Sequence, residues 1–332
     1  MFKVGLTRDF LTEEGKLSYK SIGLEIFDAY PEIEYEFLEK HHSPVTPEML
    51  QGYDAVISLT PAYNQDSFKG VDQLKAICRF GVGYDMVDVD ACTEAKVMLT
   101  ITRGAVNHSV AEATIMWMLT LSHKTFIKNQ LVRQGQWAER SKFMGSEIRG
   151  HTIGIVGLGG IGGKIVEMLA PFLPARIIAF DPYANAEKAE SLGVELVALN
   201  DLMKNADFIS VNCPLTDETR DMIKKEQLSL CKPTAYIINT ARGGIINYQA
   251  LLEILKNKAI AGYATDVFDQ EPPDTNEPLL QMENVIVAPH AIAWTNELFE
   301  TIGRMACRQV VQIYKGEKPD HLINEKVLEN IS

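Results

Sequence analysis

Short apolar segments alternate with helical patterns along almost the whole chain, and this alternation constrains the fold more than any other feature. Segments 54–58 and 75–78 are too short for helices and are bounded by turn residues, so we predict buried parallel strands. Helical patterns between most such segments predict an α/β fold with doubly wound parallel sheets. Further strands are predicted at residues 152–156, 176–180, 208–211, 235–238, 260–265 and 285–287.

Two sheets are expected, because about six strand candidates precede residue 103 and about seven follow residue 150. A length of 332 residues also favours two domains. The stretch 109–134 is predicted to be helical, and it opens with Ser109 and Glu112 at capping-box spacing. Its apolar residues occupy more than one face, so a second domain or subunit, or the core of one domain, must cover it. A last helix is predicted over residues 296–314.

Composition and charge exclude some classes of partner. The chain has 32 Lys+Arg against 44 Asp+Glu, a net charge of −12, which argues against nucleic-acid binding and against anionic membrane surfaces. The first residues are typical of a strand and not of a secretory signal, and no run of apolar residues is long enough to span a membrane. The five cysteines form no C-x-x-C pair, which favours reduced thiols in the cytoplasm, and no metal site is expected.

Residues 157–162 read Gly-Leu-Gly-Gly-Ile-Gly and fit the dinucleotide-binding pattern G-x-G-x-x-G. A predicted strand leads in and a predicted helix leads out, as this pattern requires. Gly157 permits the tight turn, Gly159 lets a pyrophosphate approach the backbone, and Gly162 lets the helix pack on the strand. The N–H groups at the start of the helix would then hold the phosphates.

Asp181 ends the next predicted strand and predicts the choice of cofactor. A carboxylate at this position accepts hydrogen bonds from the adenosine ribose hydroxyls and repels a 2′-phosphate. Pro182 and Tyr183 follow, and no Arg or Lys close by could pair with such a phosphate. The sequence therefore favours NAD over NADP.

Three ionisable residues follow later predicted strands, where ligands bind in α/β folds. Arg242 follows residues 236–241, Glu271 follows residues 264–270, and His290 follows residues 285–289. Taken singly, each could be a solvated charge or a loop residue. Together with the motifs around them, they resemble the D-isomer-specific 2-hydroxyacid dehydrogenases. The matching segments, in order along most of the chain, are residues 81–85, 109–112, 157–162, 240–243, 266–268, 271–272 and 289–290.

The resemblance implies a Rossmann NAD-binding domain, residues 103–294, inserted into a flavodoxin-like substrate-binding domain made of residues 1–102 and 295–332. It also implies an active site between the domains and a homodimer. His290 would be the general acid/base, Glu271 its carboxylate partner, and Arg242 the clamp on the substrate carboxylate. Protonated imidazole can supply the proton that a reduced 2-oxo acid needs, and guanidinium can grip a carboxylate through two parallel hydrogen bonds.

The same resemblance implies binding residues. Val82 and Gly83 would hold the substrate carboxylate through backbone N–H groups, and Asp266 would contact the nicotinamide carboxamide. The expected cofactor contacts are Gly157, Gly159, Gly160, Ile161, Gly162, Asp181, Cys213, Pro214, Thr240, Ala241, Arg242, Asp266 and His290.

The substrate is predicted less sharply than the reaction. Relatives acting on 3-phosphoglycerate commonly carry an arginine in the loop matched by residues 59–64, and this loop has none. Arg103 stands where the family more often has a small residue or proline, and Trp294 stands shortly after His290. Either could face the substrate, or Arg103 could be a solvated charge and Trp294 could pack between domains.

The expected activity is NAD-dependent interconversion of a small 2-oxo acid and its D-2-hydroxy acid, of the hydroxypyruvate or glyoxylate type. The enzyme alternative is 3-phosphoglycerate dehydrogenase. Phosphite and formate oxidation are further options, although formate enzymes lack the residue matched by Glu271. A different class of alternative is a corepressor that uses this fold as an NAD(H)-sensing scaffold.

Overall fold

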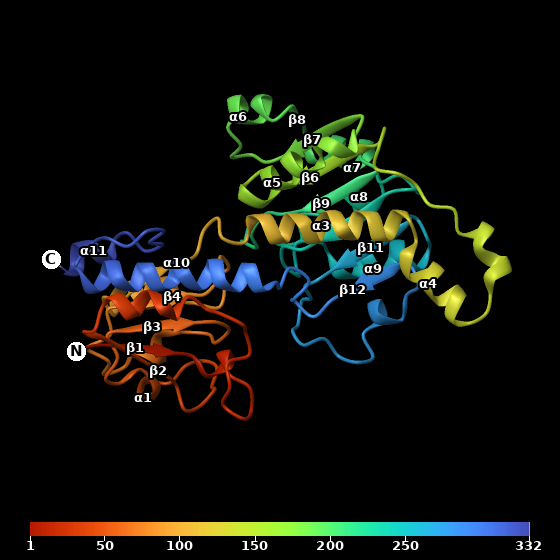
Figure 1. Cartoon of the computed structure of the whole chain (residues 1–332). Coiled ribbons are helices and arrows are strands. Elements are labelled where there is room, and N and C mark those ends of the chain that lie inside the picture. Colours follow the sequence, from red (N-terminus) through yellow and green to blue (C-terminus); the bar gives the residue numbers. More distant parts are fainter. Residues whose placement is uncertain (332) are drawn as a thin grey trace. The chain divides into compact units, whose positions relative to one another are not determined.

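A computed structural model describes residues 1–331 and divides the chain into two compact units (Figure 1). Unit 1 comprises Met1–Val106 and the segment from Trp294 onward, and unit 2 comprises Asn107–Ala293. These boundaries lie a few residues from the expected 102/103 and 294/295. Residues just after Thr102 stay with unit 1 because the Thr102 N–H donates to Gly81 O at 2.9 Å. Among residues 1–331, no helix combines the length and apolar character needed to cross a membrane.

Unit 1 is built on a parallel sheet whose strands, within the described residues, run in the order β2-β1-β3-β4-β5. This is the flavodoxin-like order. Strand β3 is buried at all its positions, as expected for a central parallel strand. The prediction of about six strands in this region was wrong, since five form. The strands are β1 Phe2–Leu6, β2 Ile33–Phe37, β3 Ala55–Ser58, β4 Ala76–Arg79 and β5 Met98–Thr100, and the helices are α1 Pro47–Leu50, α2 Val89–Glu94, α10 Asn296–Tyr314 and α11 Val327–Ile331.

Helix α10 has the bounds predicted from the sequence and packs on β3 and β4 of unit 1. Thr295 caps its first turn by accepting the Leu298 N–H at 3.0 Å. Gly303 lets the helix approach the segment before Leu24–Ala29, because a Cβ at Gly303 would lie 2.0 Å from Ile22 O. After α10 the chain is fixed to β5, where the Leu99 N–H donates to Asn324 Oδ1 at 2.8 Å.

Unit 2 contains a second parallel sheet, with the order β12-β11-β10-β9-β6-β7-β8 among the described residues. From β6 the strand order runs outward in one direction to β8, and from β9 it runs outward in the other direction to β12, so the switch point of a Rossmann fold lies between β6 and β9. The predicted α/β architecture with two parallel sheets is therefore confirmed. The strands are β6 Thr152–Val156, β7 Arg176–Phe180, β8 Val194–Leu196, β9 Phe208–Val211, β10 Tyr236–Asn239, β11 Gly262–Thr265 and β12 Val285–Val287. The helices are α3 Asn107–Ser122, α4 Thr125–Arg133, α5 Gly160–Leu169, α6 Ala186–Ser191, α7 Leu199–Asn205, α8 Lys225–Leu228 and α9 Tyr248–Lys256.

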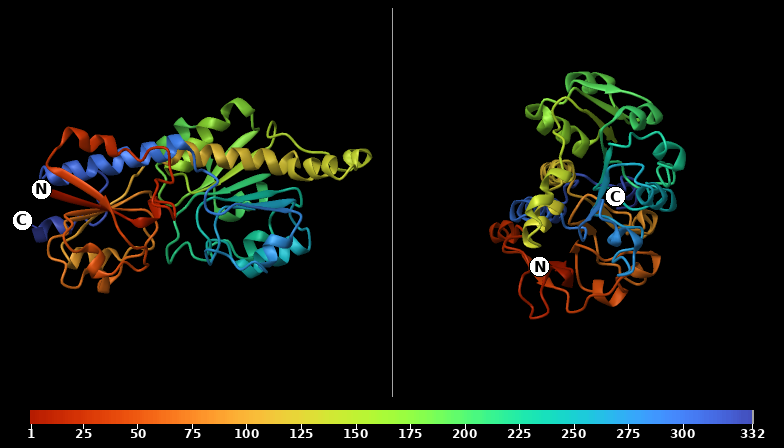
Figure 2. Two further views of the ribbon diagram at one scale, coloured as in Figure 1. Left: turned by 60° about the horizontal axis from the view of Figure 1, so that its bottom comes forward. Right: turned by 90° about the vertical axis from the view of Figure 1, so that its right-hand side faces the viewer.

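Helices cover both faces of the unit 2 sheet. Residues of α3 and α5 share one buried cluster with the strands, and residues of α7, α8 and α9 share the other. Figure 2 shows α3 on one side of this sheet and the helices of the other cluster opposite. The sheet is therefore buried on both faces, which explains why its strands read as continuous apolar runs.

The helix predicted over residues 109–134 is in fact two helices, α3 and α4. Lys124 has a left-handed backbone with φ 55°, and this residue separates them. The expected capping box does not form, because α3 begins at Asn107 and Glu112 instead lies 3.6 Å from the His108 ring. Trp117 and Met118 of α3 are buried in the core of unit 2. That core position is one of the alternatives that the sequence left open.

Candidate active site

The glycine turn joins β6 to α5 and has the features that a dinucleotide site needs. Gly157 has φ +93°, a backbone conformation that side chains disfavour, and a Cβ there would lie 2.8 Å from the Cys213 nitrogen. Gly162 is still more restricted, since a Cβ would lie 2.2 Å from Gly157 O. Both glycines are therefore required by the turn and by the packing of the helix on the strand.

Gly159 shows that the turn leaves room for a ligand. A Cβ at Gly159 would meet no atom within 4 Å, so neither packing nor a positive φ explains this glycine. The position is the one where a pyrophosphate must approach the backbone, and α5 begins at the next residue. Gly160 is instead covered, with the Asn107 side chain 2.6 Å from an added Cβ. The residues present thus fit a dinucleotide at the start of α5.

Asp181 lies where the sequence predicted, directly after β7, and it braces the glycine turn. Its Oδ2 accepts the Leu158 N–H at 2.8 Å and its Oδ1 accepts the Tyr183 N–H at 2.9 Å. Tyr183 donates its hydroxyl to Glu218 Oε2 at 2.8 Å, and this bond raises the pKa of Tyr183. Asp181 therefore lies against the glycine turn, and among residues 1–331 no lysine or arginine is hydrogen-bonded to Asp181 or to Glu218.

The loop after β9 carries Cys213 and Pro214 to the other side of the same turn. The Asn212 N–H donates to Val156 O at 2.8 Å, which extends the β6–β9 pairing up to the loop. Burial raises the pKa of the Cys213 thiol to about 11, so this cysteine is a neutral packing residue.

The loop after β10 carries Thr240, Ala241 and Arg242, and a residue missed at the sequence level holds it. Asn239 is 2% exposed; its side chain donates to Arg242 O at 2.9 Å and accepts the Ala241 N–H at 3.0 Å. The Arg242 guanidinium donates to Ala241 O at 2.7 Å. An Asn at the last position of a buried strand is the signal that could have identified this brace.

Glu271 and His290 form the expected pair. Nδ1 of His290 lies 2.7 Å from Oε2 of Glu271, and the other carboxylate oxygen accepts the Phe268 N–H at 3.0 Å. Burial alone would raise the pKa of Glu271. The hydrogen bonds from His290 and Phe268, with the positive charge of Arg242, outweigh burial and lower that pKa. The carboxylate is thus held ionised against the imidazole.

Asp266 lies at the end of β11, and its contacts were not predicted. The carboxylate accepts the N–H groups of Ala291 and Ile292, the two residues after His290. Burial raises the pKa of Asp266, and those N–H bonds and the His290 ring oppose the rise. The structure therefore brings Asp266, Glu271 and His290 together at the ends of neighbouring strands, with Arg242 close enough to act on Glu271.

The residues predicted in unit 1 follow β4 and β5, or precede α10. Val82 and Gly83 form a half-buried turn after β4. Arg79, which the sequence did not single out, donates to Ser58 O and Phe80 O next to that turn. Arg103 is exposed after β5.

Trp294 packs within unit 1. Its ring centroid lies 5.8 Å from that of Tyr19 and 5.1 Å from that of Phe299, in both cases edge to face. The Trp294 side chain is nevertheless 49% exposed. The indole is therefore packed against two aromatic rings of unit 1 while about half of its surface is exposed.

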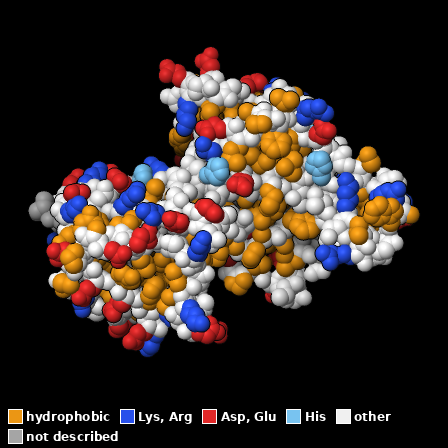
Figure 3. Space-filling view, viewed as in Figure 1, with side chains coloured by type: hydrophobic (Ala, Val, Ile, Leu, Met, Phe, Trp, Pro, Cys, Tyr) orange, Lys and Arg blue, Asp and Glu red, His pale blue; other side chains and the backbone are white. Residues whose placement is uncertain are grey.

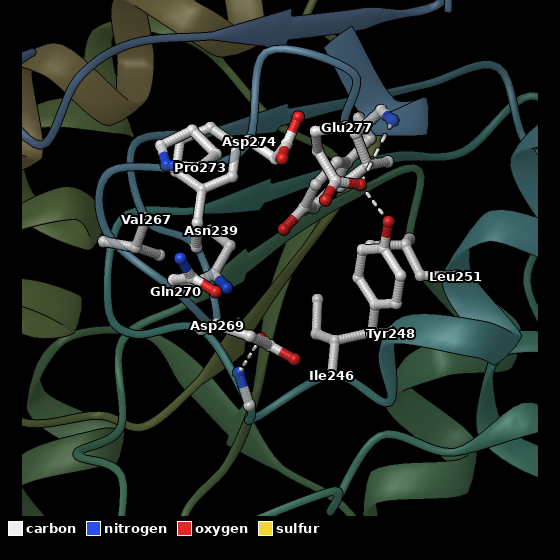
Figure 4. Close-up of a pocket in the computed structure, with 15 residues that line it drawn as sticks. Asn239, Ile246, Tyr248, Leu251, Val267, Asp269, Gln270, Pro273, Asp274 and Glu277 are labelled. Atoms are coloured by element: carbon white, nitrogen blue, oxygen red, sulfur yellow. Dashed lines mark hydrogen bonds between the residues drawn. The ribbon is translucent and has the colours of Figure 1, made fainter.

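A separate hollow of about 170 Å³ opens in unit 2 behind the loop that bears Arg242 (Figure 4). Acidic side chains line it, and the Tyr248 hydroxyl donates to Glu277 there. Asp269 accepts the Gly244 N–H at 2.6 Å at its edge. None of Arg242, Glu271 and His290 lines this hollow, so it is distinct from the candidate site.

Comparison with known proteins agrees with this geometry. The model for the NAD-binding domain of D-isomer-specific 2-hydroxyacid dehydrogenases matches residues 115–291. The chain is 41% identical over 261 residues to D-3-phosphoglycerate dehydrogenase of Methanocaldococcus jannaschii, covering 78% of this chain and 49% of that protein. The chain thus spans about half the length of that relative.

A second relative matches over nearly its full length. Glyoxylate reductase of Aeropyrum pernix is 32% identical over 333 residues, covering 98% of this chain and 97% of that protein. Among solved structures, NAD-dependent formate dehydrogenase of Staphylococcus aureus in complex with NAD superposes with a TM-score of 0.82 at 26% identity. That match covers 97% of this chain and 99% of the other.

These relatives are named as enzymes, so the corepressor alternative gains no support from them. The matched model covers most of unit 2, including the glycine turn, Arg242 and the Glu271–His290 pair. The chain therefore belongs to the D-isomer-specific 2-hydroxyacid dehydrogenases, a family of NAD-dependent oxidoreductases, with unit 2 as its NAD-binding domain.

Proposed function

We propose that this protein reduces a small 2-oxo acid of the glyoxylate or hydroxypyruvate type to the D-2-hydroxy acid, with NADH as reductant. The observation that carries the proposal is the 2.7 Å contact between His290 and the ionised Glu271, beside Arg242. An imidazole held in this way can donate a proton from its other nitrogen, Nε2, to an oxygen that develops negative charge.

Each residue has a distinct task in this proposal. NADH, held at the glycine turn before α5, would supply the hydride for the carbonyl carbon. Arg242 holds the substrate carboxylate through its fixed charge, and His290 gives its proton to the new hydroxyl oxygen. Glu271 fixes the orientation of the imidazole and favours its charged form. In the opposite direction the neutral imidazole takes the hydroxyl proton.

Unit 1 is proposed as the substrate-binding domain. The N–H groups of Val82 and Gly83 would hold the substrate carboxylate, since the turn after β4 leaves both residues half-buried. Arg103 and the exposed part of Trp294 are proposed to meet the distal end of the acid. The support is that both side chains are exposed, Arg103 after β5 and Trp294 before α10.

Two observations bear on the acid. The segment 59–64 lacks a cation, which favours an unphosphorylated substrate, and the relative matched over its full length is named a glyoxylate reductase. The second candidate is 3-phosphoglycerate dehydrogenase activity, favoured by the 41% identity to such an enzyme. A small acid is the proposal because segment 59–64 carries no cation and the relative matched over nearly its whole length is named a glyoxylate reductase.

The test is a panel of acids. Purified protein with NADH is offered glyoxylate, hydroxypyruvate, pyruvate and 3-phosphohydroxypyruvate, and NADH consumption is followed by absorbance. The proposal expects the highest kcat/KM with glyoxylate or hydroxypyruvate. A kcat/KM that is highest with the phosphorylated acid would establish the second candidate instead.

We also propose a homodimer that works in the cytoplasm. Exposed apolar side chains gather on α4 and the segment after it, where Phe126 is 54%, Val132 60% and Trp137 62% exposed. Figure 3 shows hydrophobic side chains over this end of unit 2 and over α3. Such a patch is typical of a surface that binds another protein. The five free cysteines are consistent with a reducing compartment.

A further inference from the structure

The backbone at His290 is unusual for a residue with a side chain. Its φ is +53°, in the left-handed region that glycine favours. Such a conformation persists where the surrounding structure holds it, and it is most informative at functional sites. Here it determines the direction in which the imidazole leaves the loop.

Hydrogen bonds hold the chain on both sides of His290. Before it, the Ala288 N–H donates to Thr265 O at 3.1 Å. After it, Oδ1 of Asp266 accepts the N–H groups of Ala291 at 2.9 Å and Ile292 at 3.2 Å, and Oδ2 accepts the Ile292 N–H at 3.1 Å. The left-handed turn is thus clamped to the end of β11.

Burial and a backbone hydrogen bond hold the Asp266 side chain in a fixed position. The residue is 6% exposed, and its own N–H donates to Asn239 O at 3.2 Å, so the carboxylate starts from a fixed backbone. A buried carboxylate needs partners, and the N–H groups of the turn supply them. His290 and Glu271 are the charged groups that act on it.

We propose that Asp266 is a positioning residue for proton transfer, because its carboxylate holds the turn that keeps the His290 imidazole on Glu271 with Nε2 directed to the substrate. This inference rests on the proposed function. It assigns Asp266 a task in addition to the nicotinamide contact that the family implies. The two tasks differ in what they predict, since a nicotinamide contact acts whether or not His290 is present.

A double-mutant cycle separates the two tasks. Asp266→Asn keeps the size of the side chain but turns one acceptor into a donor facing the turn. It is expected to lower kcat about 100-fold, as a misplaced catalytic group does. In the His290→Ala background the same change is expected to alter the residual turnover by less than about threefold, because the group it positions is gone.

Asp207→Asn is the matched control. Asp207 is also a largely buried carboxylate of unit 2 that holds backbone, accepting the Thr152 N–H at 2.9 Å. Asp207 directly precedes β9 and lies beside the first residue of β6, at the opposite end of that strand from the glycine turn. Its loss is expected to lower Tm without changing kcat or the pH profile. If Asp266→Asn does not fold, Asp266→Glu keeps the charge but shifts it, and the same loss of kcat is expected.

The results that would overturn the positioning role differ from the result that would overturn the proposed function. An equal loss from Asp266→Asn in both backgrounds, or a raised Kd for NADH with unchanged kcat, would overturn the positioning role and leave the proposed function intact. Full turnover by His290→Ala alone would instead contradict the proposed function, and this inference with it.

Discussion

At the scale of single residues, the catalytic proposal depends on a carboxylate that stays ionised. The pKa of Glu271 lies below its ordinary value of 4.5 because the bonds from His290 and Phe268 and the charge of Arg242 exceed the effect of burial. A lowered folded-state pKa contributes stability above the unfolded value, and this contribution is lost as the pH falls through the folded value. The Glu271 carboxylate is therefore ionised throughout the neutral range.

Glu271→Gln removes that charge and keeps the shape. The amide can still hold the ring but no longer favours its protonated form. As the pH is raised, the reductase activity is therefore expected to begin its decline at a lower pH than in wild type. The measurement is kcat/KM against pH with the preferred acid. An unchanged profile would contradict the role given to Glu271, and Glu277→Gln, a carboxylate of the separate hollow, is the control.

At the same scale, Asp181 is predicted to favour NADH over NADPH. Asp181→Ser removes the charge that would repel a 2′-phosphate, and the ratio of kcat/KM for NADPH to that for NADH is expected to rise at least about tenfold. KM for NADH is expected to rise as well, because Leu158 loses its partner in the glycine turn. Glu218→Gln tests the second carboxylate. An unchanged ratio in both variants would show that neither charge selects the cofactor.

At the scale of elements, the glycines of the turn between β6 and α5 are expected to serve two different purposes. Gly162 is required for packing, and Gly159 is proposed to leave room for the cofactor. Gly162→Ala places a methyl group 2.2 Å from Gly157 O and is expected to destabilise the protein by about 1–3 kcal/mol. Gly159→Ala meets no protein atom, so it is expected to keep Tm and to raise the Kd for NADH. Thermal unfolding and NADH titration of both variants measure the difference. Equal loss of Tm in the two variants would contradict this division.

Most elements could be predicted because their signals are local. The strand runs of both sheets, the G-x-G-x-x-G turn and α10 are each encoded by neighbouring residues. The break between α3 and α4 was missed, since it depends on a left-handed Lys124 and not on Gly or Pro. The capping box was expected at Ser109, but the helix begins earlier and the box is not needed.

The site residues were predictable as types and positions, whereas their supports were not. Arg242, Glu271 and His290 follow strands within recognisable motifs, but spacing cannot show that His290 and Glu271 come within 2.7 Å. The brace from Asn239 is local, but the spacing of residues does not show which way its side chain turns. The clamp from Asp266 joins residues 25 and 26 positions apart, so it depends on strand order, which the sequence does not state.

At the scale of the whole molecule, the net charge of −12 leaves the binding of an anionic cofactor and an anionic acid to local groups. In the proposal, Arg242 supplies a fixed charge for the acid, and backbone N–H groups at the glycine turn supply donors for the cofactor phosphates. The acidic balance therefore speaks to solubility more than to the choice of ligand.

The proposed homodimer makes a prediction at this scale. Replacing both Phe126 and Trp137 by glutamate places two charges on the apolar surface of α4 and the following segment, and the variant is expected to be monomeric. Light scattering after size-exclusion chromatography measures the mass. Glutamate at Leu173, an exposed apolar residue outside this segment, is the control. A wild-type mass of one chain would contradict the dimer.

The central claim is that His290 transfers the proton in a reduction by NADH, and one variant tests it most directly. His290→Ala is expected to lower kcat for the preferred 2-oxo acid by at least about 100-fold, the contribution of a positioned acid, while the Kd for NADH stays close to wild type. Steady-state turnover and NADH titration on the same preparation measure both quantities. Turnover within about threefold of wild type would contradict the account, because such a change is too small for the loss of the proton donor.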